Sequence, residues 1–567
     1  MPLAKNRIVI IGGVATGPKT AARCRRLDQE AEITMVERGD LLSYAGCGMP
    51  FYIEGVVEFE TLLKTSVGVT RDADYFENGM GIRVMDRTEA VKINRNSKTI
   101  TVKDLKTGET ADLPYDKLVL ATGAGPFVPR MEGVDLEGVH RLYNPHQAKA
   151  IRDALDMGAK KVAIVGGGLI GMEICGAFLE RGCEVTILEM MPRLVPALMD
   201  EEMALLLESY LKKNGVQVVT GSPVSRIVDD GSGKVAGVET ADGRRFEAEL
   251  VIVAIGVRPN VGLAVEAGLE IGPTRAIAVN EHLQTSDPDI YAGGDCVECT
   301  HLVTGEKVYA PMGSTANKHG RIIANNINGM ETDFPGVTTS AVFKILDYNC
   351  GCTGITERRA KELGYEVETS LCPQRDYSFF MPGAGMFVAK LVAEKASGKI
   401  LGCQVMGTGD GVKRIDVVAT ALKYGGSVKD LADLDLAYAP PFSQAIDAIA
   451  HAANVVRNKM DGLAHGVSPI EIKGRLESDD DFLFVDCRGR AAFEAETITD
   501  RRTVNISMEE LLERLDGEPR DREIILFCNT SITAYRAERI LKARGYKDIK
   551  FLDGSLRAWP YPLKAPF

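Results

Sequence analysis

The sequence lacks any apolar run close to the roughly 18 residues that a membrane-spanning helix requires. Its first residues enter a strand-like segment directly and lack the apolar core and cleavage site of a secretory signal. It also lacks an excess of positive charge, because 67 Lys and Arg face 79 Asp and Glu, for a net charge of -12. A nucleic-acid partner would need a basic face. We therefore expect a cytoplasmic protein that binds neither nucleic acid nor membrane.

The twelve cysteines are spread through a long chain. This distribution is typical of reduced thiols and differs from the disulfide scaffolds of small secreted proteins. Two close pairs, Cys296 with Cys299 and Cys350 with Cys352, suggest a metal site at first sight. Neither pair has further His or Cys residues at the spacing that zinc sites need. The sequence therefore predicts no metal centre.

The length of 567 residues implies three or four domains, because single domains usually contain about 100–200 residues. A strand, a helix and a strand are expected in turn at Arg7–Ile11, Pro18–Leu27 and Glu32–Glu37. The same order returns at Lys161–Val165, Met172–Arg181 and Glu184–Glu189. Two such units predict two doubly wound α/β domains, each with a dinucleotide pocket.

The later part of the chain has a different pattern of predicted secondary structure. Longer strands, such as Phe387–Ala393 and Ile400–Met406, indicate an α+β interface domain. From about Asp461 a polar stretch precedes a new α/β pattern. We interpret this stretch as a linker to a separate small domain.

The first glycine-rich turn runs from Gly12 to Gly17 between a strand and a helix. Its candidate cofactor-binding residues are Gly12, Gly13, Val14, Ala15 and Gly17. Glycines there let the backbone approach a pyrophosphate held at the helix N-terminus. Val14 replaces the second glycine of the usual fingerprint. Glu37, followed by Arg38, stands where a carboxylate accepts ribose hydroxyls; the alternative is an ordinary βα turn with an exposed acid.

The second turn, Gly166 to Gly171, fits the fingerprint fully through Gly166, Gly167, Gly168 and Gly171. Glu189 closes the following strand. A carboxylate there accepts a ribose 2′-hydroxyl and repels a 2′-phosphate, which favours NADH over NADPH. Arg193 lies nearby and weakens that preference, so NADPH stays open.

Three further segments complete the pattern. Two buried strands, Leu118–Pro126 and Val251–Asn260, bring small residues close to a ligand, with Ala121, Thr122, Gly123 and Gly256 as the candidates. The segment Ile290–Cys296 carries Asp295 after two glycines. In this order the motifs resemble the FAD-dependent pyridine nucleotide-disulfide oxidoreductases, from residue 1 to about 455. The resemblance implies FAD at the first turn, with Asp295 as a ligand, and NAD(P)H at the second.

A single cysteine, Cys47, follows the first unit in the segment from Ser43 to Tyr52. The Cys-x4-Cys pair of the family's disulfide-bearing members is absent. The segment resembles the single-cysteine branch: coenzyme A-disulfide reductases, persulfide or polysulfide reductases, and NADH oxidases and peroxidases. One thiolate can hold the oxidised equivalent only as a mixed disulfide, a persulfide or a sulfenate. A lone cysteine can also be an inert buried side chain.

Substrate candidates also follow from the resemblance. Basic residues of the first helix bind phosphates in coenzyme A-disulfide reductases, which implies Lys19, Arg23 and Arg26; a solvated basic face is the alternative. Ser43 and Asn317 join them as substrate-binding candidates. Tyr438, in the segment Leu436–Phe442, is implied to reach the cysteine of a partner subunit, where a phenol can donate a proton or stabilise a leaving thiolate. Ile446, Met381 and Gly46 depart from the coenzyme A-binding pattern, so the thiol ligand stays open.

Residues from about Pro469 to Phe567 resemble a rhodanese domain. The expected elements are a strand at Phe482–Asp486 ending in Asp486-Cys487-Arg488, a strand at Glu523–Phe527 and a helix at Ala534–Arg544. Cys528 ends the second strand ahead of the helix N-terminus, a place that stabilises a thiolate or persulfide. Ser531 and Thr533 stand where active loops carry glycine and often arginine. Because of that difference, we expect weak turnover of thiosulfate. The alternative is a domain that only docks or stores sulfur.

Together these features predict an α/β chain with two doubly wound domains, an α+β dimerisation domain and a rhodanese-like domain. The expected boundaries are FAD-binding at 1–150 and 281–332, NAD(P)H-binding at 151–280, dimerisation at 333–457, a linker at 458–468 and rhodanese-like at 469–567. We expect a homodimeric enzyme that reduces disulfide, persulfide or polysulfide sulfur at Cys47, with Cys528 handling sulfane sulfur. The cofactors are FAD and NADH, with coenzyme A as a candidate substrate or ligand. Alternatives are an NADH oxidase or peroxidase and a non-catalytic redox sensor or sulfur carrier.

Overall fold

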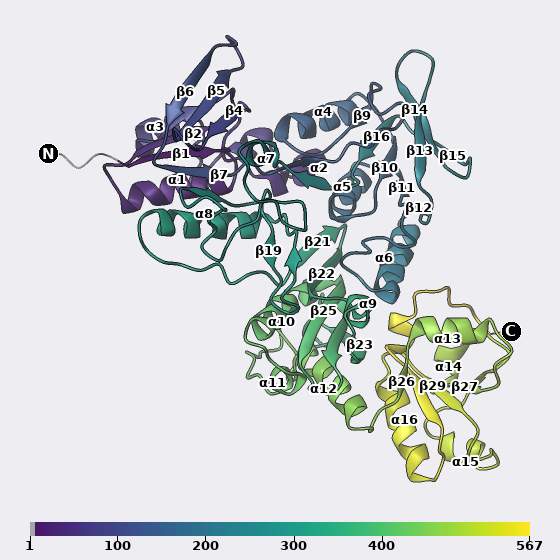
Figure 1. The fold of residues 1–567 in the computed structure, drawn as a ribbon. Helices are drawn as coiled ribbons and strands as arrows, with labels where there is room; N and C mark the ends of the chain where they lie inside the picture. The colour runs from purple at the N-terminus through teal and green to yellow at the C-terminus, as the bar shows by residue number, and fades with distance from the viewer. Residues whose placement is uncertain (1–5, 567) are drawn as a thin grey trace. The chain divides into compact units, whose positions relative to one another are not determined.

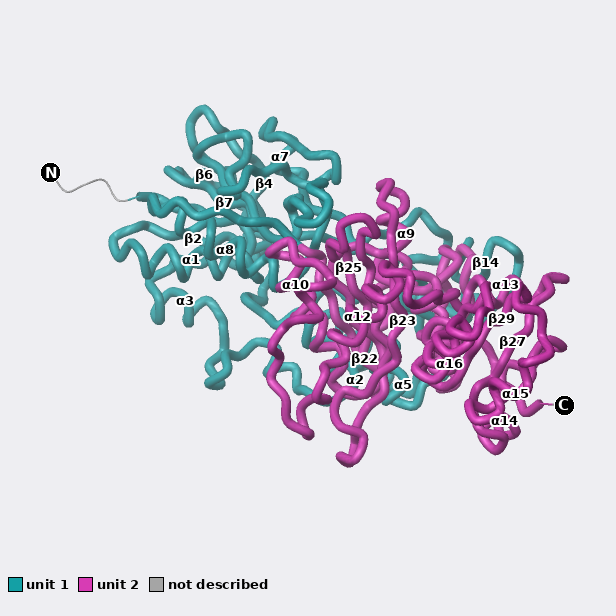
Figure 2. The backbone as a smooth tube through the Cα atoms, turned by 90° about the horizontal axis from the view of Figure 1, so that it is seen from below, with its two compact units in different colours: residues 1–166, 174–184, 224–337 teal, residues 167–173, 185–223, 338–567 magenta. Residues whose placement is uncertain are grey.

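The computed structural model describes residues 6–566, whose fold is drawn in Figure 1. The chain forms two compact units that interleave along the sequence (Figure 2). Unit 1 contains residues 1–166, 174–184 and 224–337, and unit 2 contains residues 167–173, 185–223 and 338–567. Within residues 6–566 no helix is both long and apolar enough to cross a membrane.

Unit 1 is built on a parallel sheet in the order β18-β7-β1-β2-β3. Its strands are β1 (Arg7–Ile11), β2 (Glu32–Val36), β3 (Arg83–Met85), β7 (Lys117–Leu120) and β18 (Ile290–Ala292). Helix α1 (Thr16–Leu27) follows β1 and packs against α8 (Gly313–Ile327). Because β1 and β7 are buried on both faces, each reads as a continuous apolar run.

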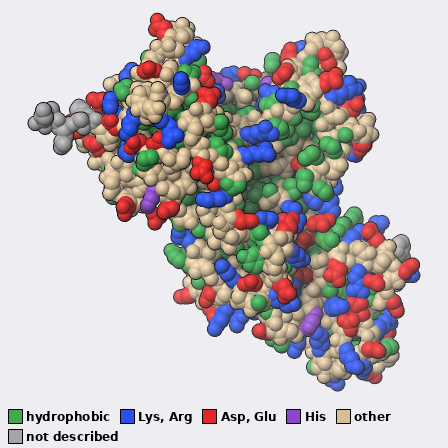
Figure 3. All heavy atoms as spheres, in the orientation of Figure 1, with side chains coloured by type: hydrophobic (Ala, Val, Ile, Leu, Met, Phe, Trp, Pro, Cys, Tyr) green, Lys and Arg blue, Asp and Glu red, His purple; other side chains and the backbone are tan. Residues whose placement is uncertain are grey.

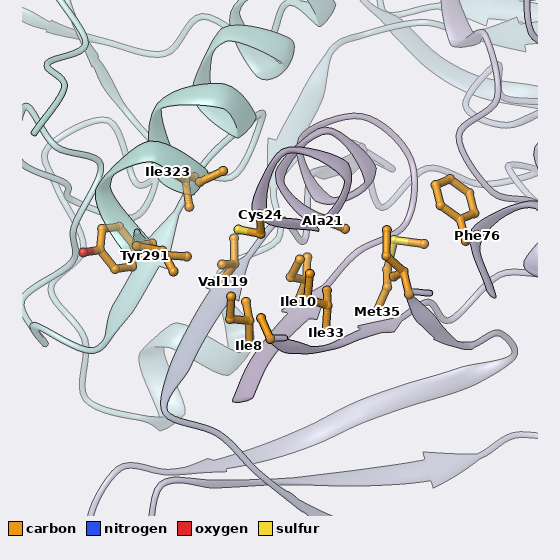
Figure 4. Packing of buried hydrophobic residues seen from close by; sticks show 14 of the residues in the cluster. Ile8, Ile10, Ala21, Cys24, Ile33, Met35, Phe76, Val119, Tyr291 and Ile323 are labelled. Carbon is orange, nitrogen blue, oxygen red and sulfur yellow. The ribbon is translucent and has the colours of Figure 1, made fainter. Parts of the chain in front are cut away.

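One core of unit 1 lies between this sheet and the two helices (Figure 4). Ile8 and Ile10 of β1 are completely buried against Cys24 of α1 and Ile323 of α8. Burying each such aliphatic side chain contributes about 1.5–3 kcal/mol. This packing fixes where β1 ends and α1 begins, and so fixes the turn between them.

The rest of unit 1 consists of smaller sheets and short helices. A second parallel sheet contains β9 (Val139–His140), β16 (Leu250–Val253) and β10 (Lys161–Val165). Antiparallel layers are formed by β4 (Thr88–Asn94), β5 (Thr99–Asp104) and β6 (Thr110–Pro114), and by β13 (Val224–Asp229), β14 (Val235–Thr240) and β15 (Arg245–Glu247). The helices are α2 (Met49–Glu54), α3 (Ala73–Met80), α4 (Pro145–Asp156) and α7 (Gly262–Glu266).

Two predicted strands of unit 1 are each interrupted, and here the sequence prediction was wrong. The segment Leu118–Pro126 forms the end of β7 and then β8 (Ala124–Pro126), and Val251–Asn260 forms most of β16 and then β17 (Val257–Pro259). The breaks occur at Gly123 and Gly256, whose φ angles of 64° and 110° lie outside the strand region. Each glycine turns the chain out of its parallel sheet, and β8 then pairs with β17 in antiparallel fashion.

The second glycine-rich turn lies between β10 and α5 (Leu169–Glu180). In unit 2, β11 (Glu184–Leu188) pairs in parallel with β12 (Gln217–Val219), and α6 (Glu201–Lys213) precedes β12. Helix α5 begins three residues earlier than the predicted Met172, because the turn runs directly into the helix.

Unit 2 also contains an antiparallel sheet in the order β21-β22-β25-β24-β23. Its strands are β21 (Ala341–Ile345), β22 (Tyr348–Gly354), β23 (Val367–Arg375), β24 (Met386–Glu394) and β25 (Ile400–Thr408). The helices around it are α9 (Glu357–Glu362), α10 (Arg414–Lys423), α11 (Val428–Ala432) and α12 (Ala448–Met460). The predicted strands at Phe387–Ala393 and Ile400–Met406 correspond to β24 and β25.

A buried ion cluster joins β24 to the first residues of α6 and α9. The ammonium of Lys390, 1% exposed, lies 3.1 Å from Asp200, 2.5 Å from Glu202 and 2.6 Å from Glu357. The carboxylates come from the start of α6 and of α9. A buried charge needs partners of opposite sign, so these segments are fixed relative to one another.

The C-terminal part of unit 2 is a parallel sheet in the order β26-β30-β29-β27-β28. Its strands are β26 (Gly466–Val467), β27 (Leu483–Asp486), β28 (Thr503–Asn505), β29 (Ile524–Phe527) and β30 (Ile549–Leu552). The helices are α13 (Pro469–Leu476), α14 (Arg490–Ala495), α15 (Leu511–Leu515) and α16 (Ile532–Ala543). The segment predicted as a linker, 458–468, holds the end of α12 and strand β26, which pairs with β30.

A second buried ion pair connects this part to the antiparallel sheet. Lys459 of α12 donates to Asp553 over 2.6 Å and to the carbonyl of Thr369 over 2.7 Å. The backbone N–H of Leu371 in β23 donates to the same carboxylate over 3.3 Å. Both charged side chains are 6% exposed. Asp553 therefore holds the loop after β30 against β23 and α12.

Charged side chains of both signs are interspersed over the described surface in Figure 3. The net charge of -12 is therefore not gathered in one acidic area on that face.

Candidate functional site

The first glycine-rich turn leaves room for a ligand because two glycines allow close backbone contacts. Gly12 has a φ of 115°, and a Cβ atom there would lie 2.0 Å from the carbonyl oxygen of Ala121. A Cβ atom on Gly17 would lie 1.8 Å from the carbonyl oxygen of Gly12. Val14 and Ala15 complete the turn into α1. The turn can therefore present backbone N–H groups at a helix N-terminus, which suits a pyrophosphate.

Two carboxylates stand near this turn. Glu37 accepts hydrogen bonds from the N–H groups of Gly13, over 2.6 Å, and Gly39, over 2.7 Å, while Arg38 lies 3.8 Å from Glu89. Asp295 has a buried carboxylate oxygen with no hydrogen-bond partner among the described residues. Burial raises the pKa of Asp295 to about 6. An orphaned acceptor of this kind fits a ligand that brings hydroxyl groups, as the ribityl chain of FAD does.

The segment after β7 is held by reciprocal hydrogen bonds. The hydroxyl of Thr122 donates to the carbonyl of Asn260 over 2.7 Å, and the Asn260 amide donates to the carbonyl of Thr122 over 2.8 Å. These two hydrogen bonds hold Gly123 next to the antiparallel pair of strands β8 and β17. Gly256 directly precedes β17.

The second turn repeats the geometry of the first. A Cβ atom on Gly166 would lie 2.5 Å from the carbonyl oxygen of Ala254. Glu189 accepts from the N–H of Gly167 over 2.6 Å and from that of Met191 over 2.7 Å. Gly168 has an open surrounding, and Gly171 lies within α5. The Arg193 guanidinium lies 2.5 Å from the Glu201 carboxylate, so its charge is already balanced.

The reactive-cysteine candidate lies in a short 3-10 turn, Gly46–Gly48, immediately before α2. Cys47 is exposed, whereas the other eleven cysteines are buried. A Cβ atom on Gly313, the first residue of α8, would lie 3.9 Å from the Cys47 sulfur. The sulfur therefore lies close to the start of this fifteen-residue helix, and a helix N-terminus favours a thiolate.

Burial makes most other thiols poor nucleophiles. It raises the pKa to about 12 for five of them: Cys24, Cys175, Cys299, Cys352 and Cys372. Thiols with such values stay protonated at neutral pH. Cys47 is thus the candidate that combines exposure with a helix N-terminus.

The remaining candidates of unit 1 surround this region. The N–H of Ser43, which has a φ of 45°, donates to the carbonyl of Gly13 over 2.7 Å and so ties the Cys47 loop to the first turn. Lys19, Arg23 and Arg26 share one face of α1 at helical spacing. Arg23 donates to Asn325 of α8 over 3.1 Å, and Lys19 and Arg26 are exposed. Asn317 is exposed one turn after Gly313.

Tyr438 lies in unit 2, in the segment between α11 and α12, and is 51% exposed. Six other large apolar side chains between residues 338 and 457 are more than half exposed: Val342, Phe379, Phe380, Tyr424, Phe442 and Ile446. Large contiguous patches of such side chains mark interaction surfaces, whereas single ones are common on any protein.

Cys528 directly follows strand β29 and is 3% exposed. Its N–H donates to the hydroxyl of Ser555 over 3.1 Å. Arg488 pairs with Asp486, at 2.8 Å, and reaches the Asn529 side chain in the Cys528 loop at 3.4 Å. The cation is therefore balanced by Asp486. The sequence analysis did not identify Ser555, Gly313 or the contact between Arg488 and Asn529. A signal for Ser555 was its place after Gly554, just beyond strand β30.

Within residues 6–566 no group of three or more His, Cys, Asp or Glu side chains is placed to hold a metal ion. The Cys296 thiol instead donates to the carbonyls of Leu120 and Gly293, over 3.4 and 3.3 Å. Cys299 lies 4.0 Å from a ring nitrogen of His319.

Comparison with known families decides the identity of this arrangement. Residues 6–320 match the pyridine nucleotide-disulphide oxidoreductase family, and residues 340–450 match the dimerisation domain of the same family. The chain belongs to this family. Residues 468–560 match the rhodanese-like domain. Members of the family are enzymes that bind FAD and NAD(P)H, so the predicted fold class, enzyme class and cofactors are confirmed.

Several oxidoreductases of this family resemble the chain closely. A structure described as a NAD-dependent persulfide reductase from A. fulgidus is 42% identical, with a TM-score of 0.93, covering 98% of this chain and 100% of that one. The NAD(P)H coenzyme A polysulfide/persulfide reductase of Pyrococcus horikoshii is 36% identical over 80% of this chain and 99% of its own length. An NADH oxidase of Methanocaldococcus jannaschii is 35% identical over 80% and 99% respectively.

Proposed function

We propose that the protein reduces persulfide, polysulfide or disulfide sulfur with electrons from NAD(P)H, using Cys47 as the redox thiol. The observation that carries this proposal is the exposed Cys47 sulfur opposite the start of α8. The names of the A. fulgidus and P. horikoshii relatives support the sulfur substrate. The rhodanese-like domain, with Cys528, would receive or supply sulfane sulfur.

The chemistry at Cys47 balances as thiol-disulfide exchange. The Cys47 thiolate attacks a disulfide, a sulfur–sulfur bond forms, and the other half leaves as a thiolate. FAD and NAD(P)H, when bound, supply the two electrons that cleave the mixed disulfide and return Cys47 to its thiolate. A persulfide substrate reacts in the same way and releases hydrosulfide or a thiol. The α8 N-terminus stabilises negative charge on the cysteine before and after the exchange.

The substrate is proposed to be a thiol derivative that carries phosphate groups, such as coenzyme A. Support comes from the basic face of α1, where Lys19 and Arg26 are exposed and Arg23 contacts α8. Ser43 and Asn317 flank the same loop and helix. Ile446, Met381 and Gly46 differ from the coenzyme A-binding pattern, so the proposal rests on the basic face of α1.

We further propose a homodimer in the cytoplasm. The family's dimerisation domain and its exposed Phe379, Phe442 and Ile446 support self-association. Tyr438 would then serve as a proton donor to Cys47 of the partner. The eleven buried cysteines are all thiols, which suits a reducing compartment.

The nucleotide donor is proposed to be NADH in preference to NADPH. Glu189 stands at the second turn, and Glu201 balances the charge of Arg193. A carboxylate without a nearby spare cation disfavours a 2′-phosphate.

The alternative is an NADH oxidase in which Cys47 cycles through a sulfenate. The M. jannaschii relative supports it, because that protein is named NADH oxidase. Its match covers 80% of this chain, whereas the persulfide reductase match covers 98%. The C-terminal domain therefore favours sulfur chemistry.

Cys47→Ser tests the proposal. The variant should bind FAD and still accept hydride from NADH, but it should not reduce polysulfide, a persulfide or coenzyme A disulfide, because serine forms no mixed disulfide. Steady-state NADH oxidation with each acceptor measures the loss, and Cys24→Ser, a buried thiol of α1, is the matched control. Turnover near that of the native protein with all three acceptors would refute the single-cysteine reaction. Intact-protein mass spectrometry of the native chain should also show any adduct on Cys47.

A further inference from the structure

Two serines near Cys528 have backbone conformations that non-glycine residues rarely adopt. Ser531 has a φ of 70° and Ser555 a φ of 48°. Both are buried, with exposed fractions of 9% and 0%. Left-handed backbone at such residues is unfavourable and persists only where the surroundings hold it, often at functional sites. The loops after β29 and β30 thus bring two strained, buried hydroxyls together.

The Ser555 hydroxyl contacts the backbone and the sulfur of Cys528. It accepts from the Cys528 N–H over 3.1 Å and lies 3.9 Å from the Cys528 sulfur. It also lies 3.3 Å from the carbonyl of Leu552. The hydroxyl has one proton, so the sulfur and the carbonyl compete for it.

Ser531 affects this competition. Its hydroxyl donates to the carbonyl of Leu552 over 2.9 Å and lies 3.2 Å from the Ser555 oxygen. With Ser531 satisfying that carbonyl, the Ser555 proton is available to the sulfur. A hydroxyl donor to an ionised acceptor makes a stronger hydrogen bond than one between neutral groups.

The nearby cation does not serve the sulfur in the same way. The Arg488 guanidinium makes three hydrogen bonds to Asp486, of 3.0, 3.2 and 2.8 Å, and one to the carbonyl of Glu496, of 2.5 Å. Its contact with the loop is through the Asn529 side chain. The polar contact to the Cys528 sulfur comes from the neutral Ser555 hydroxyl, whereas this guanidinium reaches the Asn529 side chain.

We propose that Ser555 is a catalytic residue of the rhodanese-like domain, donating the hydrogen bond that stabilises negative charge on the Cys528 sulfur, with Ser531 orienting it. This inference rests on the proposed sulfur-carrying role of Cys528. The Cys528 thiolate attacks the outer sulfur of thiosulfate, a sulfur–sulfur bond forms, and sulfite leaves with the electron pair of the broken bond. Negative charge passes from the thiolate to the persulfide, and Ser555 keeps its proton throughout.

Two substitutions separate the hydroxyl from the backbone. Ser555→Gly removes the hydroxyl and suits the positive φ, whereas Ser555→Ala removes the hydroxyl and keeps the unfavourable conformation. Threonine is unsuitable because β-branching makes positive φ worse. The matched control is Ser507→Ala, which removes an exposed hydroxyl from the same domain.

The experiment uses the full-length holoenzyme. Iodoacetamide alkylation of Cys528 is followed by peptide mass spectrometry, and the persulfide is quantified after exposure to thiosulfate. Loss of a hydrogen bond to charged sulfur should slow alkylation about 10- to 100-fold in both Ser555 variants and not in Ser507→Ala. Loosened packing would have the opposite effect, because it would expose the thiol and speed alkylation.

Unchanged or faster alkylation in both Ser555 variants would overturn the inference, as would a loss in Ser555→Ala alone. The two proposals fail differently. Absence of any persulfide on native Cys528 would refute the sulfur-carrying role, while the alkylation rates would still decide the role of Ser555. Persulfide that forms equally in native protein and both variants, with equal alkylation rates, would refute Ser555 alone.

Discussion

The strongest test of nucleotide choice is Glu189→Gln. The native carboxylate accepts hydrogen bonds from Gly167 and Met191 and remains next to the turn where the adenosine ribose of the donor would lie. Glutamine has the same shape but keeps only one acceptor oxygen, so one of the two backbone N–H groups, that of Gly167 or that of Met191, loses its acceptor. The substitution therefore removes the negative charge together with one of these two hydrogen bonds.

The expected size of the effect follows from that charge. A phosphate about 4 Å from a carboxylate is repelled by about 4 kcal/mol per unit charge at an effective dielectric constant of about 20. Screening by salt reduces this repulsion energy, and we take about 2 kcal/mol as its value, which corresponds to roughly 30-fold in rate. Hydrogen bonds from ribose hydroxyls to a charged acceptor contribute about 1.5–3 kcal/mol for NADH. Glu189→Gln should therefore lower the NADH-to-NADPH preference at least 30-fold, by about 2 kcal/mol or more.

Stopped-flow bleaching of the flavin with each donor measures the ratio of kcat/KM values. Glu37→Gln is the matched control, since Glu37 makes the same two contacts at the first turn. It should weaken FAD retention and leave the donor ratio unchanged. Glu201→Ala, which releases Arg193, should raise the efficiency of NADPH further in the Glu189→Gln background. Native protein that uses NADPH as well as or better than NADH would refute the reasoning.

Three other variants test separate parts of the structure. Cys528→Ala should slow NADH oxidation driven by a sulfane donor far more than oxidation driven by a small disulfide; equal losses would refute the division of labour. Asp295 has a pKa raised by burial to about 6 from 3.8, so FAD-free native protein binds more protons than the unfolded chain and should lose stability as pH rises from about 4 to 6. Asp295→Asn should flatten that dependence of the melting temperature, and an unchanged slope would contradict the assignment. Lys390→Met leaves buried carboxylates without their cation and should destabilise the protein by about 3–5 kcal/mol, seen as a lower denaturation midpoint; an unchanged midpoint would show that the cluster contributes little.

Much of the nucleotide-binding fold could be predicted from the sequence, because its signals are local. The strands at Arg7–Ile11 and Lys161–Val165 were predicted with the boundaries that β1 and β10 have. Each is a short apolar run that ends at a glycine-rich turn. The first helix begins at Thr16, two residues before the predicted Pro18, because proline is tolerated within the first turn of a helix.

Other features depend on contacts distant in sequence and could not be predicted. The breaks at Gly123 and Gly256 reflect the pairing of β8 with β17. Lys390 is a charged residue within the apolar strand β24, and its place is explained only by its ion pairs with Glu202 and Glu357, which lie far away in the sequence. The position of Ser555 beside Cys528 requires two loops to converge from neighbouring strands. The candidate site residues were identified by motif, and their roles stay predictions until the variants are measured.

The ion pair between Lys459 and Asp553 determines where the rhodanese-like domain can be separated from the rest of the chain. The match to the P. horikoshii relative covers 99% of that protein and 80% of this chain, and a separate family model matches residues 468–560. By homology the C-terminal domain is therefore an independent module. In the structure, however, this domain shares buried contacts with the preceding part of the chain. Asp553 is paired with Lys459 of α12, and Ser555, two residues after Asp553, contacts Cys528. A fragment starting at residue 468 would leave that carboxylate without Lys459 and the N–H of Leu371. Transplanting this domain to another reductase would therefore require the end of α12 and the edge of β23 to travel with it.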